Sequence, residues 1–306
     1  MKTKANTGKL YLLMFILSIV WGLSFIFAKF ALEDLNTVEV LAVRWPMAAI
    51  LFTLLVLFKV VKVDYKSKSK SDIRTLLLLV LCQPCLYAIL EIVGLDYTTS
   101  SESSVIIAMI PLTVVVNSSI IFKEKVASKT KLGILIAFAG VICCIVFSPG
   151  FSIGGKGIGY LCLIGAVICG SFYSILGAKL GSKFTPMEIT YAMTVGGGVW
   201  FFIWSLLAGN CMHPYKVLFA GGMCTWSLIY LGILCSFMAY LIYNISLANL
   251  SAALATCIIS NSINVVGVIA GIIITKDPWG IYTVLGLLLI VFGIVVANLE
   301  DLKKKS

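Results

Sequence analysis

The chain has 306 residues, of which 60% are hydrophobic and 12% are charged, and its mean hydropathy is +1.08. Soluble domains carry about a quarter charged residues, so this composition excludes an ordinary soluble protein and indicates one embedded in a membrane. The net charge of +10 does not indicate nucleic-acid binding, because the basic residues gather in particular loops between apolar stretches. The ten cysteines lie mostly within apolar stretches and therefore do not indicate a disulfide framework.

Apolar runs long enough to cross a bilayer recur along the whole chain. A helix needs about 20 apolar residues to span a hydrocarbon core of roughly 30 Å. The first run is longer than the apolar core of a signal peptide and lacks a cleavage site after it, so we expect it to be retained. We predict an all-α membrane protein with ten transmembrane helices, over residues 10–32, 37–58, 74–95, 101–122, 131–148, 157–178, 187–208, 226–248, 251–274 and 279–298.

The basic residues predict the orientation of these helices. If the N-terminus is cytoplasmic, eighteen basic residues fall in inner loops and four in outer loops, and Arg44, within a span, is the last of the 23. This bias follows the positive-inside rule. We therefore expect a multi-pass protein of the plasma (inner) membrane, in contact with the lipid bilayer, with both termini cytoplasmic.

Weak internal similarity divides the chain into two repeats, residues 1–148 and 149–306. Each repeat contains five predicted spans, and because five is odd, the second repeat must enter the membrane from the opposite side. Two related halves of opposite topology are typical of secondary transporters, with the binding site near the midplane. Aligning Glu124 with Asp277 matches Gly133 with Gly286 and Gly140 with Gly293, and a one-residue gap then matches Gly94-Leu95 with Ser246-Leu247.

Several of these motifs, in this order, resemble the EamA-type branch of the drug/metabolite transporter superfamily. The resemblance covers nearly the whole chain and implies ten helices, two inverted repeats, a central cavity, and export or exchange of small metabolites. The motifs are Trp21-Gly22 with Lys29, Arg44, the segment Gly94-Leu95-Asp96-Tyr97-Thr98, Pro111, Glu124, and the pair Gly133 and Gly140.

The sequence also departs from that family's pattern at four points. Glu91 occupies a position that is usually aromatic, and its counterpart in the second repeat is Tyr243. Glu102 stands where small residues are usual. Asn264 replaces a proline in the second repeat, and Asp277 replaces a glutamate in the following turn.

Arg44 and Glu91 are the charged residues that we expect within the membrane. Their predicted depths differ by about 5 Å at a rise of 1.5 Å per residue, so their side chains can meet. Charges inside spans are costly and mark functional sites or partners. Two interpretations stay open. In one, Arg44 binds an anionic group of the substrate and Glu91 takes up a proton; in the other, the two form a structural ion pair.

Other polar residues complete the candidate binding site. Gln83, Tyr87 and Glu91 are spaced by four and share one face of a predicted helix. The second repeat supplies a similar patch, and two asparagines lie mid-span in the ninth helix, where they either bind substrate or join helices by hydrogen bonds. These further candidates are Tyr240, Tyr243, Asn244, Asn261 and Asn264.

Four glycines give the fifth and tenth predicted helices a small-residue face. Such faces allow close packing of helices in membranes, either within a monomer or in a homodimer, and we expect packing within the monomer. The four are Gly133, Gly140, Gly286 and Gly293.

The sequence does not support an enzyme, a metal site or a bound cofactor. Cys82 and Cys85 have a CxxC spacing but no partner Cys or His nearby, and His213 is the only histidine, which gives little support to a catalytic triad. We expect a secondary-active transporter of small metabolites such as amino acids, an exporter or exchanger. Multidrug efflux of lipophilic cations, with Glu91 as counter-charge, and a non-transporting membrane protein are the alternatives.

Overall fold

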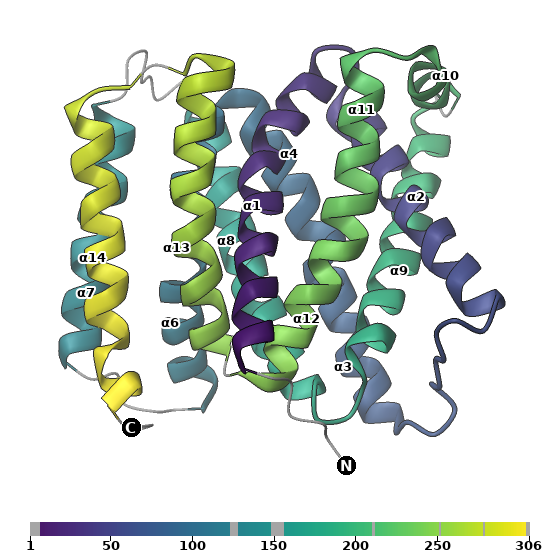
Figure 1. Cartoon of the computed structure of the whole chain (residues 1–306), viewed down its shortest axis with the longest axis horizontal. Helices are drawn as coiled ribbons and strands as arrows, with labels where there is room; N and C mark the ends of the chain where they lie inside the picture. The colour runs from purple at the N-terminus through teal and green to yellow at the C-terminus, as the bar shows by residue number, and fades with distance from the viewer. Residues whose placement is uncertain are drawn as a thin grey trace.

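The computed structural model describes residues 7–122, 128–147, 156–209, 212–250, 252–277 and 279–303. Within these ranges the protein is entirely helical, without any strand, as the sequence predicts. The helices lie side by side, and the first helix begins at the same lower edge at which the last one ends (Figure 1). Glu124, which the sequence alignment matches with Asp277, lies outside the described residues.

The elements follow one another along the chain as fourteen α-helices and three π-helical segments within the described ranges. They are α1 (Thr7–Leu32), α2 (Thr37–Leu57), α3 (Lys70–Val80), η1 (Leu81–Leu86), α4 (Tyr87–Tyr97), α5 (Ser100–Ile107), α6 (Ile110–Phe122), α7 (Ser128–Val146), α8 (Lys156–Leu180), α9 (Pro186–Leu207), α10 (His213–Ala220), α11 (Met223–Ile229), η2 (Tyr230–Ala239), α12 (Tyr240–Asn249), α13 (Ala252–Ala270), η3 (Gly271–Thr275) and α14 (Ile281–Lys303).

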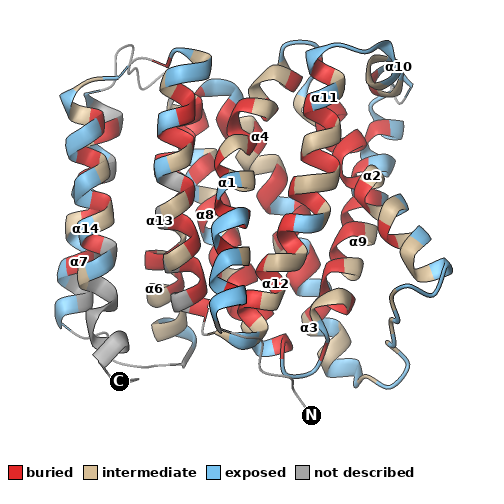
Figure 2. Ribbon diagram, viewed as in Figure 1, coloured by how far each residue is buried: buried red, intermediate tan, exposed pale blue. Residues whose placement is uncertain are grey.

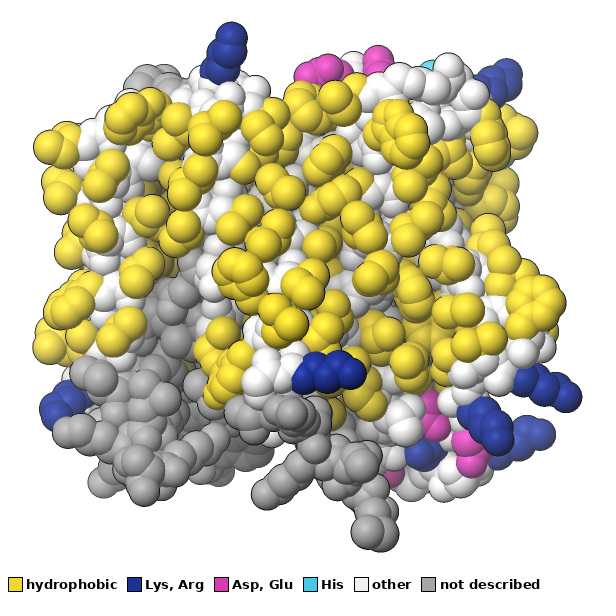
Figure 3. All heavy atoms as spheres, viewed as in Figure 1, with side chains coloured by type: hydrophobic (Ala, Val, Ile, Leu, Met, Phe, Trp, Pro, Cys, Tyr) yellow, Lys and Arg dark blue, Asp and Glu magenta, His cyan; other side chains and the backbone are white. Residues whose placement is uncertain are grey.

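Eight helical stretches of the described chain are long and apolar enough to cross a membrane. They correspond to eight of the ten predicted spans. The other two, in α7 and α14, have shorter apolar parts, Leu135–Cys144 and Ile281–Gly293. Hydrophobic side chains cover the middle of the visible face, and charged side chains lie toward its upper and lower edges (Figure 3). This distribution suits a bundle surrounded by lipid.

The most extensive helix contacts join the first half of the chain to the second. They pair α7 with α14, α2 with α9, α1 with α13, and α4 with α8. Buried residues lie on the inward faces of the central helices, whereas exposed residues follow their outer faces (Figure 2). The core is therefore shared between the two halves, and neither half buries its apolar surface alone.

The four glycines of the predicted small-residue face lie where α7 meets α14. A Cβ atom added at Gly140 would lie 2.6 Å from the carbonyl oxygen of Gly286, and one added at Gly293 would lie 2.6 Å from that of Gly133. The backbones thus approach more closely than any side chain would allow. The structure places this packing within one chain.

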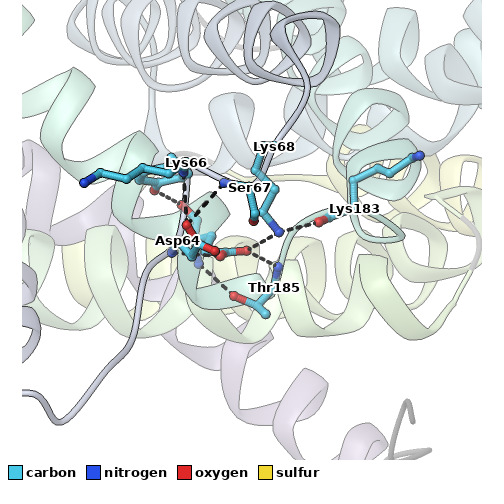
Figure 4. Close-up of polar contacts among 8 residues, drawn as sticks. Asp64, Lys66, Ser67, Lys68, Lys183 and Thr185 are labelled. Carbon is cyan, nitrogen blue, oxygen red and sulfur yellow. Dashed lines mark hydrogen bonds and ion pairs between the residues drawn. The ribbon is translucent and has the colours of Figure 1, made fainter.

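At the lower edge, the loop between α2 and α3 is attached to the start of α9 (Figure 4). The Lys68 ammonium lies 3.5 Å from a Glu188 carboxylate oxygen and donates to the carbonyl of Lys183 at 2.8 Å. The amide of Asp64 donates to Glu188, and hydrogen bonds from Ser67 hold the pKa of the Asp64 carboxyl below its usual value. This loop therefore has a defined conformation against the second half of the chain.

A similar contact occurs at the upper edge, where the helix start belongs to the first half and the segment that contacts it belongs to the second half. Glu39 belongs to a capping box with Asn36 at the start of α2, and its carboxylate lies 2.8 Å from His213 Nδ1 at the start of α10. Glu188 forms the corresponding capping box with Thr185 at the start of α9. The N-terminal end of α9 is thus held by the α2–α3 loop, and that of α2 by the start of α10, so each is held by a segment of the other half.

The glycine contact yields the first prediction. Replacing Gly140 with Ala should lower the midpoint of thermal unfolding in detergent, because the new methyl group meets backbone atoms of α14 that cannot rotate away; overpacking of this kind costs about 1–3 kcal/mol. The matched control is Gly157→Ala in α8, where nothing lies within 4 Å of the new Cβ. Equal midpoints for the two variants would contradict this packing.

Candidate functional site

A cavity lies at the centre of the bundle, between the two halves, and about 60 Å³ of it is open to water-sized molecules. Its lining residues come from α1, α2, η1, α4, α5, α6, α8, α12 and α13, and are Trp21, Ser24, Phe25, Arg44, Gln83, Tyr87, Glu91, Ile107, Ile110, Gly170, Tyr173, Ser174, Tyr240, Tyr243, Thr256, Ile259, Ser260 and Ile263.

One interrupted helix lines this cavity, and a second contacts its lining residue Arg44. In η1, Pro84 lacks an amide donor, and Gln83 has an extended backbone with φ −143° and ψ 116°. The predicted alignment of the two repeats superposes residues 81–86 on 233–238. The segment η2, which departs from α-helical geometry, therefore lies at the matching place in the second half. Interruptions at corresponding positions of two halves are typical of transporter binding sites.

Arg44 and Glu91 meet at the edge of the cavity. An Arg44 guanidinium nitrogen lies 3.9 Å from a Glu91 carboxylate oxygen, and the two side chains are 4% and 12% exposed. Arg44 Nε also donates to Ser236 Oγ of η2 at 2.6 Å, and the Tyr87 hydroxyl donates to the other Glu91 oxygen at 2.8 Å. The two buried charges therefore lie side by side, each with a further hydrogen-bond partner.

Gly232 explains how η2 comes close enough to reach Arg44. A Cβ atom at this position would lie 2.8 Å from the sulfur of Met47 and 3.3 Å from the carbonyl oxygen of Arg44. A larger residue would push η2 away from α2. Because Ser236 follows one turn later, its hydroxyl lies beside the guanidinium.

Aromatic rings form another part of the cavity wall. Trp21 of α1 packs edge-on against Tyr240 and Tyr243, with ring centres 5.0 and 5.2 Å apart. Tyr173 of α8 lies 5.7 Å from Tyr243, and the Gln83 amide donates to the Tyr240 hydroxyl. The cavity thus offers one cation, one anion and several aromatic faces.

The predicted polar stripe on the third span reaches the cavity by a different geometry than expected. Gln83, Tyr87 and Glu91 all line the cavity, but Gln83 does not lie on a continuous α-helix with the other two. The interruption at η1 turns its side chain toward Tyr240. Spacing by four therefore identified the right residues although the helix is broken between them.

Asn244 lies behind the aromatic wall and does not line the cavity. It is 1% exposed, accepts a hydrogen bond from the Tyr173 hydroxyl at 2.8 Å and donates to Thr190 at 2.9 Å. Its contacts orient Tyr173. The side chains of Asn261 and Asn264 lie outside what the structure describes.

Several lining residues were not singled out from the sequence. Trp21 stands in the sequence only among the family motifs, and Ser24, Tyr173, Ser174, Thr256 and Ser260 are not among the predicted site residues. A signal was present, since Trp21, Ser24 and Phe25, like Gly170, Tyr173 and Ser174, follow the i, i+3, i+4 spacing of one helix face. In an apolar helix this pattern is equally typical of ordinary packing, so it did not identify a site.

The groups around the cavity can bind ligands through charge, hydroxyls and aromatic faces. Within the described ranges, no cluster of three or more His, Cys, Asp or Glu side chains could hold a metal ion. Arg44 suits a carboxylate or phosphate because its guanidinium can donate two parallel hydrogen bonds. Glu91 suits an ammonium group or a proton.

The contact between Arg44 and Glu91 yields the second prediction. Arg44→Gln or Glu91→Gln alone should lower the free energy of unfolding by about 3–5 kcal/mol, because each leaves one charge buried without its counterpart. The double variant should lose less than the sum of the two single losses. Unfolding in detergent measures this coupling, and Arg74→Gln, at an exposed arginine, is the control. Additive losses would show that the charges do not interact.

Comparison with known proteins agrees with this architecture. The model of the EamA-like transporter family matches residues 8–146 and 157–299. The uncharacterized transporter YcxC of Bacillus subtilis (strain 168) is 28% identical over 300 residues, which cover 97% of this chain and 94% of that protein. An uncharacterized transporter of Archaeoglobus fulgidus is 25% identical over 281 residues, 90% of this chain and 94% of its own.

A solved crystal structure shares the fold. Its sequence is 15% identical, and it superposes on 97% of this chain and 98% of its own with a TM-score of 0.71. The family match covers most of the sequence, and the apolar helices are those of a multi-pass membrane protein. The chain belongs to the EamA-like transporter family.

Proposed function

We propose that the protein is a secondary-active transporter that moves a small metabolite, such as an amino acid, across the membrane by alternating access. The observation that carries this proposal is the central cavity between the two halves: Gln83 of η1 lines it, and η2, at the matching position of the other half, contacts its lining residue Arg44 through Ser236. A cavity between two such halves can be exposed to either face when one half rocks against the other.

The proposal includes ten transmembrane helices arranged as two inverted repeats, residues 1–148 and 149–306. The pairing of α2 with α9 and of α7 with α14 supports it, because each pair joins helices at equivalent places in the two halves. The basic loop around Lys68, at the same edge as the start of α1 and the end of α14 (Figure 1), supports a cytoplasmic location for that edge. We propose the plasma membrane as the location.

The groups around the cavity support an amino acid as the substrate. Its carboxylate would bind Arg44 in a charge-assisted hydrogen bond, and its ammonium group would lie beside Glu91. Trp21, Tyr240 and Tyr243 offer faces for an apolar or aromatic side chain. The direction of transport that we propose is export or exchange.

We further propose that Glu91 is the group that couples transport to protons. It lines the cavity, its carboxylate accepts a hydrogen bond from the Tyr87 hydroxyl, and the Arg44 guanidinium lies 3.9 Å from it. Both can release it when a substrate carboxylate competes for Arg44. Protonation of Glu91 would remove its charge whenever neither Arg44 nor the substrate's ammonium group balances it.

Binding of the substrate is tested by thermal stability of the purified protein in detergent. Amino acids, nucleotide sugars, polyamines and lipophilic cations are added in turn at two pH values. A ligand that binds only the folded state adds about 2.7 kcal/mol of stability at a hundredfold excess over its Kd. We expect carboxylate-bearing compounds to raise the midpoint, and Arg44→Gln to abolish the increase. An increase with cations alone, lost in Glu91→Gln, would instead indicate drug efflux.

Proton coupling is tested in reconstituted vesicles with the ligand so identified. Glu91→Gln should abolish uptake driven by a pH gradient while exchange of labelled for unlabelled substrate continues, because exchange needs no net proton movement. The control is Glu33→Gln, at an exposed acid. Gradient-driven uptake that persists in Glu91→Gln would refute the proton role.

A further inference from the structure

The helix α5 has an unusual combination of polarity and burial. Its sequence from Ser100 to Ile107 begins with four serines and a glutamate, and all eight of its residues are buried. Polar groups removed from water are unfavourable unless they are hydrogen-bonded. Ser104 bonds the carbonyl of Ser101 at 2.9 Å, but the Ser101 hydroxyl, 5% exposed, has no partner among the described residues.

Asp277, in the turn after η3, holds the beginning of this helix. One carboxylate oxygen accepts a hydrogen bond from the backbone amide of Ser101 at 2.8 Å, and the other accepts from the Thr275 hydroxyl at 2.7 Å. The Ser101 amide is among the first amides of α5, which have no acceptor within the helix. A carboxylate there is favoured by the helix dipole, so the contact ties the two halves of the chain together.

Glycines bring the two partners close along this contact. A Cβ atom at Gly271 would lie 2.7 Å from an Asp277 carboxylate oxygen and would also overlap the Ser101 hydroxyl. One turn deeper, a Cβ atom at Gly267 of α13 would lie 2.7 Å from the Cβ of Ser104. The helix α5 and the segment α13–η3 are therefore in close contact from Asp277 to Gly267.

This contact ends at the cavity. Ile107, the last residue of α5, and Ile263 of α13 both line it. Ile107 follows Ser101 by six residues, which is about 9 Å at a rise of 1.5 Å per residue. The chain that follows α13 reaches the upper edge of the bundle (Figure 1), so the contact lies between the cavity and that edge.

We propose that Asp277 and the start of α5 form the outer gate of the transporter, closed in this structure. The gate opens when the carboxylate of Asp277 releases the Ser101 amide and α5 separates from α13–η3. Water then reaches the serines of α5, which explains their polarity, and gives the Ser101 hydroxyl a partner. This inference rests on the proposed alternating access, because it takes this structure to be the state in which the cavity is closed to the outer face.

The gate is tested by the reactivity of a thiol introduced by Ser104→Cys, at a position that is 0% exposed in the closed state. The protein in lipid nanodiscs is treated with a water-soluble maleimide, and peptide mass spectrometry measures alkylation at each position. Adding Asp277→Ala should accelerate alkylation at position 104 by about tenfold, the effect on an open–closed equilibrium of losing one charge-assisted hydrogen bond. Gly271→Ala should act in the same direction.

One control variant and a native thiol serve as references. Asp96→Ala, at an exposed acid near the same edge, should change the rate little. Native Cys235, 0% exposed in η2, should stay unreactive. An unchanged rate in both Asp277→Ala and Gly271→Ala, or an equal rise at Cys235, would overturn the gate, since the latter indicates general loosening.

The assay needs no substrate, so it separates the gate from the proposed function. Acceleration at position 104 in a protein that transports none of the tested metabolites would support the gate and count against the proposed substrates. Gradient-driven transport by a protein whose position 104 does not respond to Asp277→Ala would support transport and refute this gate.

Discussion

A guanidinium and a carboxylate held inside an apolar bundle constrain everything around them. Burying Arg44 or Glu91 without the other would be unfavourable, because the desolvation free energy of a lone charge exceeds the free energy gained by packing its side chain. Their separation of 3.9 Å is longer than a close hydrogen-bonded pair. Ser236 and Tyr87 supply the shorter bonds. The charges are thus held mainly by neutral partners, which leaves the space between them open to competition from a ligand.

Those neutral partners depend on interrupted helices. In a regular helix every interior amide and carbonyl is paired, and the helix presents only side chains to a cavity. The interruption at Gln83 changes the direction of the chain, so that its amide reaches Tyr240, while η2 places Ser236 beside Arg44. Departures from α-helical geometry often occur at functional sites. Here they bring polar groups of both halves to one cavity.

The sequence predicted the all-helical fold and the meeting of Arg44 with Glu91, because apolar length and intramembrane charge are strong signals. It also predicted that the glycine faces of the fifth and tenth spans pack closely within the monomer, but not that Gly140 meets Gly286. It did not predict the role of Tyr173, since an aromatic residue in an apolar helix has the same pattern whether it faces a cavity or a core. Nor did it predict that Asn244 lies behind the cavity wall, because helical spacing indicates a face and not the layer that the face meets.

The buried acids differ in the kind of partner that they bind, and this difference separates structural carboxylates from the candidate site. Glu39, Glu102 and Glu188 each stand at the third position of a helix and form capping boxes with backbone amides of that same helix end. Asp277 differs from these three, because the amide that it binds belongs to another helix, across the proposed gate. The pattern of Ser, Thr or Asn three residues before Glu makes the first three recognisable from sequence. Glu91 lies within a helix, where the amides are already paired, so its carboxylate is bound by the side chains of Tyr87 and Arg44. Side chains rotate without unwinding a helix, and a carboxylate bound in this way can exchange its partners during a transport cycle.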